Sequence, residues 1–122
     1  VMIAGIMEHI EEAGIHSGDS ACSIPTFSLD NNIIDQIKKF TIDLANSLET
    51  IGLMNVQYAV KNKDIYILEA NPRASRTIPF LAKALGIPFI RIAASLIAGK
   101  LLSKDIMEID TNKLPYFAIK EA

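Results

Sequence analysis

The clearest pattern in the chain is a helical repeat of apolar residues between positions 30 and 51. Apolar side chains recur there at steps of three and four residues, at Ile33, Ile34, Ile37, Phe40, Leu44, Leu48 and Ile51. This spacing places them on one face, so we predict an amphipathic helix. Ser28 or Asp30 is the expected N-terminal cap, and Gly52 is the expected end of the helix.

Apolar runs that contain β-branched residues predict strands on both sides of this helix. One such run before it covers residues 1–10, and two after it cover residues 53–60 and 65–70. Residues 15–24 alternate loosely between apolar and polar residues and predict a second strand before the helix, which ends at Pro25. The polar segment 61–64 separates the last two runs. We therefore predict that these two strands form a hairpin.

Two shorter helices are expected after the hairpin. One covers residues 77–85 and ends at Gly86, and the next runs from Pro88 to Gly99. Residues 114–117 are expected to form a final strand or an extended tail. This order of elements predicts an α+β fold with a mainly antiparallel sheet packed with helices. A length of 122 residues fits one domain or a piece of a larger domain.

Composition and charge narrow the classes of function. Half of the 122 residues are hydrophobic (50%) and the formal net charge is −2, without a basic stripe that would favour nucleic acid or an anionic membrane. The longest apolar stretch, 87–98, is too short to span a bilayer. Cys22 is the single cysteine. We interpret it as a small, partly buried hydrophobic residue rather than a nucleophile, in a reducing cytoplasmic setting.

The predicted hairpin carries the strongest chemical pattern. If residues 62–64 form the turn, Gln57 lies directly opposite Glu69, and Asn55 lies opposite Asn71. The other face then holds three apolar pairs, which are Val60 with Tyr66, Tyr58 with Leu68, and Val56 with Ala70. A two-residue turn would mix apolar and polar residues on both faces, so the pattern favours the three-residue turn.

This register predicts a metal site, because Gln57, Glu69 and Asn71 bring one carboxylate and two amide oxygens to one face. Mg²⁺ prefers oxygen ligands and usually takes one or two carboxylates together with substrate phosphates. Arg73 and Arg76 follow directly and are candidates to pair with phosphate oxygens. Metal ligands followed by guanidinium groups indicate phosphoryl transfer.

The alternative is that these polar side chains are solvated residues on the open face of a sheet. We favour the metal site because Ile65 and Ile67 are expected to share the face of Glu69. A carboxylate beside apolar neighbours requires a partner.

A second polar segment, residues 14–20, contains two glycines and two serines. Small residues let a backbone approach a ligand closely, and His16 is a candidate hydrogen-bond donor or base. Taken alone, a Gly-Asp-Ser string is more often an ordinary turn. His9 is interpreted as a structural histidine or as a charge partner of Glu11.

Four strings together resemble the large subunit of carbamoyl-phosphate synthetase, at residues 6–11, 14–23, 55–60 and 69–77. The Glu-x-Asn-Pro-Arg string alone suggests only the ATP-grasp superfamily. The His-Ser-Gly-Asp-Ser string and the Ala-Ser-Arg-Thr continuation are more specific. That subunit has two ATP-grasp halves, of which the first phosphorylates bicarbonate and the second carbamate, and this chain looks more like the second.

The resemblance implies an ATP-dependent ligase of arginine and pyrimidine biosynthesis that uses ATP and Mg²⁺ or Mn²⁺ and phosphorylates carbamate. Arg73 and Arg76 would face the transferred phosphoryl group. Gln57, Glu69 and Asn71 would hold the metal ions. The implied nucleotide-binding residues are Gly14, Ile15, His16, Ser17, Gln57 and Glu69.

The resemblance also implies that residues 1–122 are a single partial domain, the C-terminal lobe of an ATP-grasp domain. The earlier lobe would precede Val1, which is not a methionine and begins inside a predicted strand. The remainder of the large subunit and a glutaminase small subunit would be its partners. We expect the isolated chain to be inactive and to self-associate through unpaired strand edges.

Three alternatives remain at this stage. The chain could be the bicarbonate-phosphorylating half, another ATP-grasp ligase, or a non-catalytic association module. Biotin carboxylases usually follow Glu-x-Asn-x-Arg with Gln-Val-Glu-His, whereas this chain has Ala-Ser-Arg-Thr at residues 74–77. That difference counts against a carboxylase.

Overall fold

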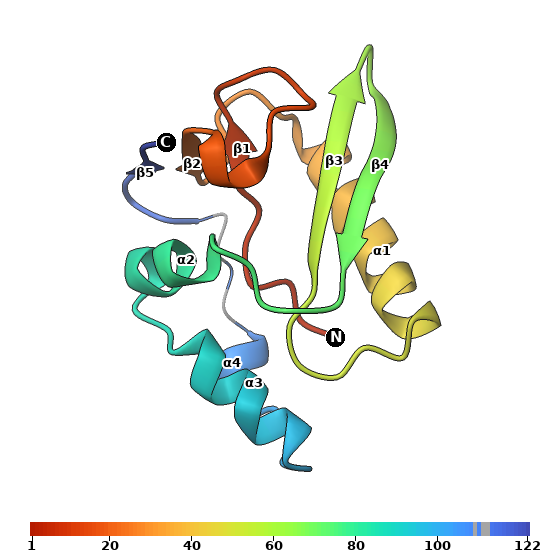
Figure 1. Cartoon of the computed structure of the whole chain (residues 1–122), viewed down its shortest axis with the longest axis vertical. Helices are drawn as coiled ribbons and strands as arrows, with labels where there is room; N and C mark the ends of the chain where they lie inside the picture. Colours follow the sequence, from red (N-terminus) through yellow and green to blue (C-terminus); the bar gives the residue numbers. More distant parts are fainter. Residues whose placement is uncertain (109, 111–112) are drawn as a thin grey trace.

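The computed structural model describes residues 1–108, 110 and 113–122. These residues form two small antiparallel sheets with helices packed around them, as Figure 1 shows. The elements in chain order are β1 (Glu8–His9), the 3₁₀ helix η1 (Ser17–Asp19), β2 (Cys22–Ile24), α1 (Asn31–Ser47), β3 (Asn55–Lys61), β4 (Asp64–Asn71), α2 (Ile78–Leu85), α3 (Phe89–Ile97), α4 (Lys104–Met107) and β5 (Ala118–Lys120). The mixture of helices and antiparallel strands confirms the predicted α+β class.

The strands divide into two sheets. One has the order β1-β2-β5 with antiparallel pairing throughout, and the other is the β3-β4 hairpin. β2 is therefore the central strand of the first sheet, and its three residues are all buried.

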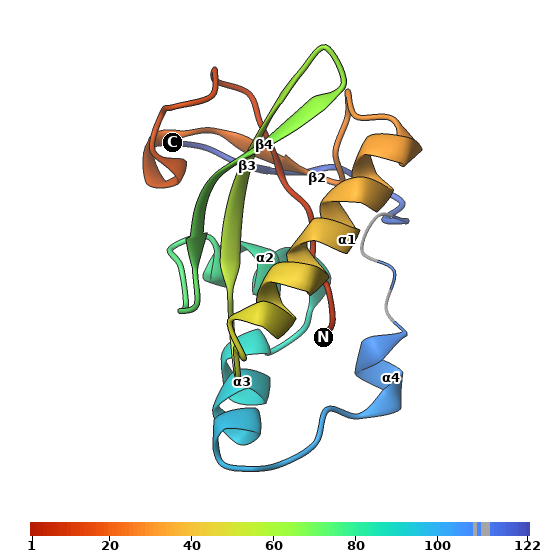
Figure 2. The same ribbon diagram turned by 90° about the vertical axis from the view of Figure 1, so that its right-hand side faces the viewer.

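The hairpin packs against α1 through one of its two faces. Figure 2 shows α1 running alongside β3 and β4. Tyr58 of β3 and Thr41 of α1 share a hydrogen bond of 2.8 Å between their hydroxyl oxygens. Burial raises the pKa of Tyr58, and the bond with Thr41 opposes this shift. Because side chains alternate along a strand, Gln57 lies on the hairpin face that points away from α1.

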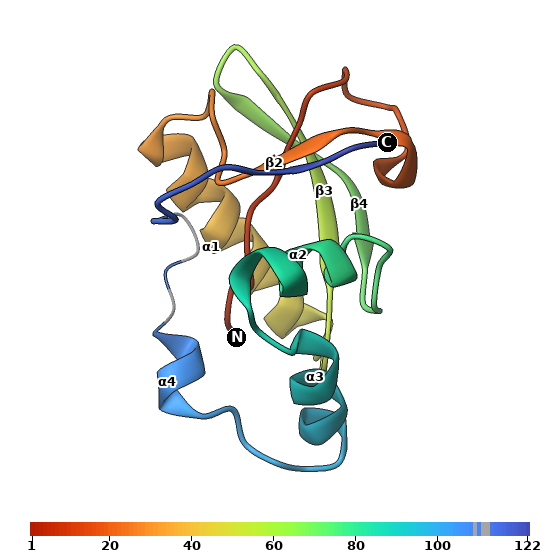
Figure 3. The ribbon, with the colours of Figure 1, turned by 90° about the vertical axis from the view of Figure 1, so that its left-hand side faces the viewer.

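The main core lies between the first sheet and the helices α2 and α3. Ile24, Ile78, Leu81 and Phe89 form its buried cluster, and Figure 3 shows α2 lying beneath β2. Gly5 lets the N-terminal segment pass close to this cluster, since a methyl group there would lie 2.7 Å from a Leu81 methyl carbon.

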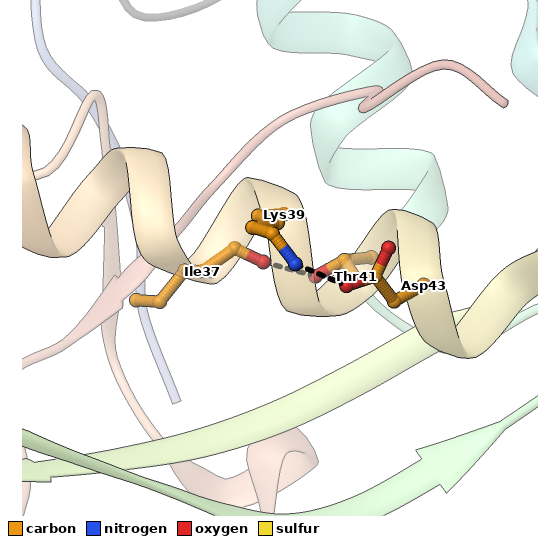
Figure 4. Close-up of polar contacts among 4 residues, drawn as sticks. All are labelled: Ile37, Lys39, Thr41 and Asp43. Atoms are coloured by element: carbon orange, nitrogen blue, oxygen red, sulfur yellow. Dashed lines mark hydrogen bonds and ion pairs between the residues drawn. The ribbon is translucent and has the colours of Figure 1, made fainter.

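The long helix begins as predicted and ends earlier than predicted. Asp30 is its cap, because the carboxylate accepts a hydrogen bond of 2.9 Å from the Ile33 N–H. The helix stops at Ser47, and Glu49 has a positive φ of 48°. Along the helix, Thr41 donates to the Ile37 carbonyl, and Lys39 pairs with Asp43 at 2.7 Å, as Figure 4 shows.

The N-terminal strands are shorter than predicted. Among the described residues, only residues 8–9 of segment 1–10 and residues 22–24 of segment 15–24 pair with a neighbouring strand. Gly14, with φ of 108°, and η1 interrupt the second run.

The later elements agree better with the sequence. α2 ends at Gly86, which has a left-handed φ of 69°, and α3 ends two residues before Gly99. The final strand comes directly after the predicted residues 114–117 rather than over them, and the short helix α4 was not predicted.

Among the described residues, no single helix has both the length and the hydropathy needed to cross a membrane. α2 and α3 meet that requirement only when taken together, and the two are bent by 114° at the break between them.

Candidate functional site

The predicted polar pairs are present at the base of the hairpin. Gln57 lies opposite Glu69, and Asn55 lies opposite Asn71. Val56 and Ala70 form the pair between them, as predicted. The alternation of side chains along both strands therefore places all four polar residues on one face.

The register near the hairpin tip differs from the prediction. Tyr58 pairs with Ile67 and Val60 pairs with Ile65, so each pair is shifted by one residue. The turn has two residues, Asn62 and Lys63, with φ of 52° and 69°. Positive φ at both positions is the geometry of a type I′ turn, which matches the twist of antiparallel strands. The predicted three-residue turn is wrong for this reason.

A β-bulge reconciles the two registers. The pairing shifts between Gln57 and Tyr58, and Leu68 has no partner in the ladder. One extra residue on β4 therefore lets a two-residue turn coexist with the Gln57–Glu69 pair.

The bulge also overturns one argument made from the sequence. Ile65 and Ile67 lie opposite Val60 and Tyr58, on the face away from Glu69. They were predicted to share the face of Glu69, and they do not. Glu69 is exposed to solvent, so apolar neighbours on β4 do not create its need for a partner.

The donor set on this face fits a hard divalent cation. Gln57, Glu69 and Asn71 supply oxygen atoms from two paired strands, and Gln57 and Asn71 are half-buried. One carboxylate with amide oxygens leaves positions for water and phosphate, as Mg²⁺ sites usually require. Within the described part of the chain, no group of three His, Cys, Asp or Glu residues could hold a metal. On the hairpin, the side-chain oxygens offered to a metal are one carboxylate, from Glu69, and the two amides, from Gln57 and Asn71.

The segment 14–20 forms an open turn followed by η1. Gly14 has a positive φ and would have free space around a side chain. Ile15 is 41% exposed. The Gly18 N–H donates to His16 Nδ1 at 3.0 Å, and His16 thereby caps η1, which begins at Ser17. In a neutral imidazole this bond requires the proton on Nε2, so the Nε2–H group of the exposed His16 is a hydrogen-bond donor.

Arg76 lies against this segment. A methyl group at Gly18 would be 3.1 Å from Arg76 Nη1 and 3.2 Å from His16 Nδ1. The guanidinium and the imidazole therefore flank Gly18. Gly18 has no positive φ, so the close approach of these two side chains, rather than its backbone conformation, favours glycine here. The structure thus brings together two predicted site residues, His16 and Arg76, that are 60 positions apart.

Arg73 follows the hairpin on the surface. Its backbone N–H donates to the Asn71 carbonyl at 2.8 Å, and Nη1 donates to the Ala74 carbonyl at 2.9 Å. The side chain is exposed and follows Asn71 by two positions. It is therefore available to an anion next to the hairpin.

Sequence reasoning missed the loop contacts of three charged residues. Glu8 accepts hydrogen bonds from the N–H groups of Phe27 and Ser28, at 2.7 and 2.9 Å, and from the Ser28 hydroxyl. Glu11 accepts from the Ala21 N–H at 2.7 Å. Lys120 donates to the Ser20 carbonyl at 2.8 Å. No local pattern pointed to Glu8 or Lys120, because their partners lie 19 to 102 positions away.

Cys22 and His9 have the structural character expected of them. Cys22 is fully buried, and its thiol donates to the Ser20 carbonyl at 3.5 Å. Burial raises the pKa of the Cys22 thiol, which disfavours the reactive thiolate. His9 is half-buried in β1, and burial lowers its pKa while the charge of Glu11 raises it.

Comparison with known proteins identifies the family of the chain. Residues 1–105 match the family described as "Carbamoyl-phosphate synthase L chain, ATP binding domain". The chain is 56% identical over 122 residues to the carbamoyl phosphate synthase large chain of Archaeoglobus fulgidus, 53% over 122 to that of Haemophilus ducreyi, and 52% over 126 to that of Rhizobium meliloti. Each alignment covers 100% of this chain and 11% of the relative. The chain therefore belongs to the carbamoyl-phosphate synthase L-chain ATP-binding domain family.

Proposed function

We propose that this chain forms part of an ATP-dependent site that phosphorylates carbamate, as the C-terminal lobe of an ATP-grasp domain. The observation that carries the proposal is the direct opposition of Gln57 and Glu69 on the exposed face of the hairpin, with Asn71 on the same face. Membership of the ATP-binding domain family supports ATP as the phosphoryl donor. The strings at residues 7–10 and 16–22 support the carbamate half over the bicarbonate half.

In this proposal, the hairpin binds the metal ion and the basic residues after it bind the transferred phosphoryl group. Gln57, Glu69 and Asn71 hold Mg²⁺ or Mn²⁺, and a bound ion supplies charge neutralisation to the phosphates. Arg73 and Arg76 pair with oxygens of the transferred group. Gly14, Ile15, His16 and Ser17 line the nucleotide pocket together with Gln57 and Glu69. The remainder of a large subunit and a glutaminase subunit are the proposed protein partners.

The reaction is a single group transfer. A carbamate oxygen attacks the γ-phosphorus of ATP and forms a new P–O bond. The bond from that phosphorus to the β–γ bridging oxygen breaks, and its electron pair leaves with ADP. The products are carbamoyl phosphate and ADP. Arg73 and Arg76 stabilise the negative charge on the transferred group while these bonds change.

The metal site can be tested on the chain itself. Mn²⁺ is paramagnetic, so it broadens the NMR signals of nuclei near its site. We expect the side-chain amide signals of Gln57 and Asn71 to broaden first. Glu69→Gln should weaken Mn²⁺ binding by roughly tenfold or more. Asp64→Asn, in the same strand but at the hairpin tip, should leave it unchanged. Equal effects of the two variants would contradict the site.

An activity measurement is needed to decide whether the substrate is carbamate or bicarbonate. Because the alignment with the Archaeoglobus fulgidus large chain spans all 122 residues, residues 1–122 can replace the aligned segment of that protein. We expect the hybrid protein to make ATP from ADP and carbamoyl phosphate, which is the reverse of the proposed step. We also expect the Glu69→Gln variant of the hybrid to lose this activity and the Asp64→Asn variant to keep it. If Glu69→Gln instead abolished only bicarbonate-dependent ATP hydrolysis, the bicarbonate half would be the correct assignment.

A further inference from the structure

Lys120 reaches across the first sheet to the backbone of the segment that carries His16. Lys120 ends β5 and pairs with Cys22 of β2. Its ammonium donates to the Ser20 carbonyl at 2.8 Å and to the Gly18 carbonyl at 3.5 Å. These partners are 100 and 102 positions away in the sequence. Lys120 is half-buried, and the two carbonyls replace part of the water around its ammonium.

The same segment is held from its other side by an anion. The Ala21 N–H donates to Glu11 Oε2 at 2.7 Å. A cation thus binds the carbonyls and an anion binds the following N–H. Hydrogen bonds to charged groups are stronger than those between neutral groups. The Gly18–Ala21 backbone is therefore fixed from two directions.

Fixing this backbone also fixes His16. The Gly18 N–H donates to His16 Nδ1 at 3.0 Å, and the Asp19 N–H donates to the His16 carbonyl at 2.8 Å. The Ser20 hydroxyl donates to the same carbonyl at 3.2 Å, and Ser20 is fully buried. Each of these three donor residues lies within the stretch that Lys120 and Glu11 hold. A displacement of Gly18 or Ser20 would therefore move the imidazole and the start of η1.

We propose that Lys120 is a positioning residue, which holds the 16–20 segment so that His16 and Ser17 meet the nucleotide with fixed geometry. This inference rests on the proposed function for its ligand, which is a nucleoside triphosphate. The loop geometry is independent of that function, because it follows from the contacts of Lys120. The two parts can therefore be tested separately.

Amide hydrogen exchange tests the loop geometry without any ligand. Lys120→Met keeps most of the side-chain length and removes the ammonium. We expect the Gly18, Asp19 and Ala21 amides to exchange roughly tenfold faster or more, because charged hydrogen bonds are lost. Amides of the β3–β4 ladder should be unchanged, whereas a general loss of stability would accelerate both groups. Lys100→Met, at an exposed position, is the matched control and should change neither.

A second signature comes from the imidazole. When Gly18 moves away, His16 Nδ1 loses its donor, and the preference for the Nε2–H tautomer weakens. The two ¹⁵N shifts of the His16 ring should therefore move closer together in Lys120→Met. Lys120→Arg, which keeps a cation, should restore both the ring shifts and the slow exchange in part. Unchanged exchange and ring shifts in Lys120→Met would overturn the proposal.

Titration with MgATP then separates this inference from the proposed function. Where the wild-type chain binds, we expect Lys120→Met to weaken binding by roughly tenfold, in parallel with faster loop exchange. Faster exchange with unchanged affinity would overturn the positioning role. A wild-type chain that binds no MgATP would count against the proposed nucleotide site, whereas faster loop exchange in Lys120→Met would still support the hold of Lys120 on the segment.

Discussion

At the scale of single residues, His9 links folding to pH. Burial is the largest cause of its lowered pKa, Glu11 opposes the shift, and Lys120 adds to it. In the unfolded chain the pKa of His9 has its ordinary value of 6.5. Between the lowered pKa of the folded chain and this value, the unfolded chain therefore binds a proton that the folded chain does not. The stability that this contributes is complete above that value and is lost as pH falls through the folded pKa.

We expect His9→Gln to reduce this loss, because glutamine does not titrate. Urea denaturation at pH values from about 7.5 to 5 would measure the free energy of unfolding of both proteins. The decline below 6.5 should be shallower in the variant. Parallel curves for the two proteins would show that His9 does not cause the decline.

Cys22 gives a second prediction at this scale. The side chain has no solvent exposure, and burial raises its pKa. We expect Cys22 of the folded chain to react with a thiol reagent such as DTNB only as fast as the structure around it opens. In the closed structure the reagent cannot reach the thiol, and the reactive thiolate is disfavoured. In urea the thiol should react at once. Immediate reaction of the folded chain would contradict the structural interpretation of Cys22.

At the scale of elements, the N-terminus of α1 depends on one side chain. Asp30 caps the helix through the Ile33 N–H. Asp30→Ala should lower the free energy of unfolding by about 1 kcal/mol, as urea denaturation would measure. Asp35→Ala removes an exposed carboxylate one turn into the same helix and should cost much less. Equal losses would indicate a general charge effect rather than a cap.

The hairpin shows what sequence patterns can and cannot determine. Alternation predicted the Gln57–Glu69 pair correctly because both strands keep a strict period of two below the bulge. It failed at the tip, where Val60 and Tyr66 are 37% and 52% exposed. Little apolar surface is buried there to fix the register. The register at the tip is set instead by the turn residues Asn62 and Lys63, which have left-handed backbone conformations.

Other elements were mispredicted because an apolar pattern cannot show what covers it. Ile51 continues the repeat of α1, yet it is 71% exposed and lies beyond the helix end. Most of residues 1–10 have strand-like composition but no strand partner in the part of the chain that the structure describes. The position of the 14–20 segment in the candidate site was also not predictable from the sequence pattern. Its contact with Arg76 depends on how α2 packs against the first sheet, and local spacing does not contain that information.

The bulge gives a prediction for the hairpin as a unit. Deleting Leu68 removes the unpaired residue, so the registers on both sides become continuous and Gln57 stays opposite Glu69. We expect the cross-strand NMR contacts of that pair to persist, with a stability change of no more than about 1 kcal/mol. Deleting Ala59 from β3 would leave two surplus residues on β4 and should disrupt the pairing. Loss of the Gln57–Glu69 contacts after removal of Leu68 would contradict the bulge.

At the scale of the whole molecule, an apolar surface remains uncovered. Ile10, Phe27, Phe117 and Ile119 line a shallow depression of about 340 Å³ beside the first sheet, together with Ser23. Each of the four apolar side chains is more than half exposed. Apolar patches and free strand edges both favour association. We therefore expect the isolated chain to form dimers or larger species at high concentration.

Light scattering across a range of concentrations would measure this association. Phe27→Ser should shift the chain toward monomer, because it removes a large ring from the patch. Leu101→Ser removes an apolar side chain that is 95% exposed but lies outside the depression, so it should have little effect. A wild-type chain that stays monomeric throughout would contradict the prediction.

The bond between Lys120 and the Ser20 carbonyl also has a consequence for the order of events during synthesis. A ribosome makes the 16–20 segment about a hundred residues before it makes β5. Contacts of such long sequence separation form late and slowly. A nascent chain that has not reached Lys120 therefore carries the His16 segment without its cation, so this segment matures after the hairpin rather than with it.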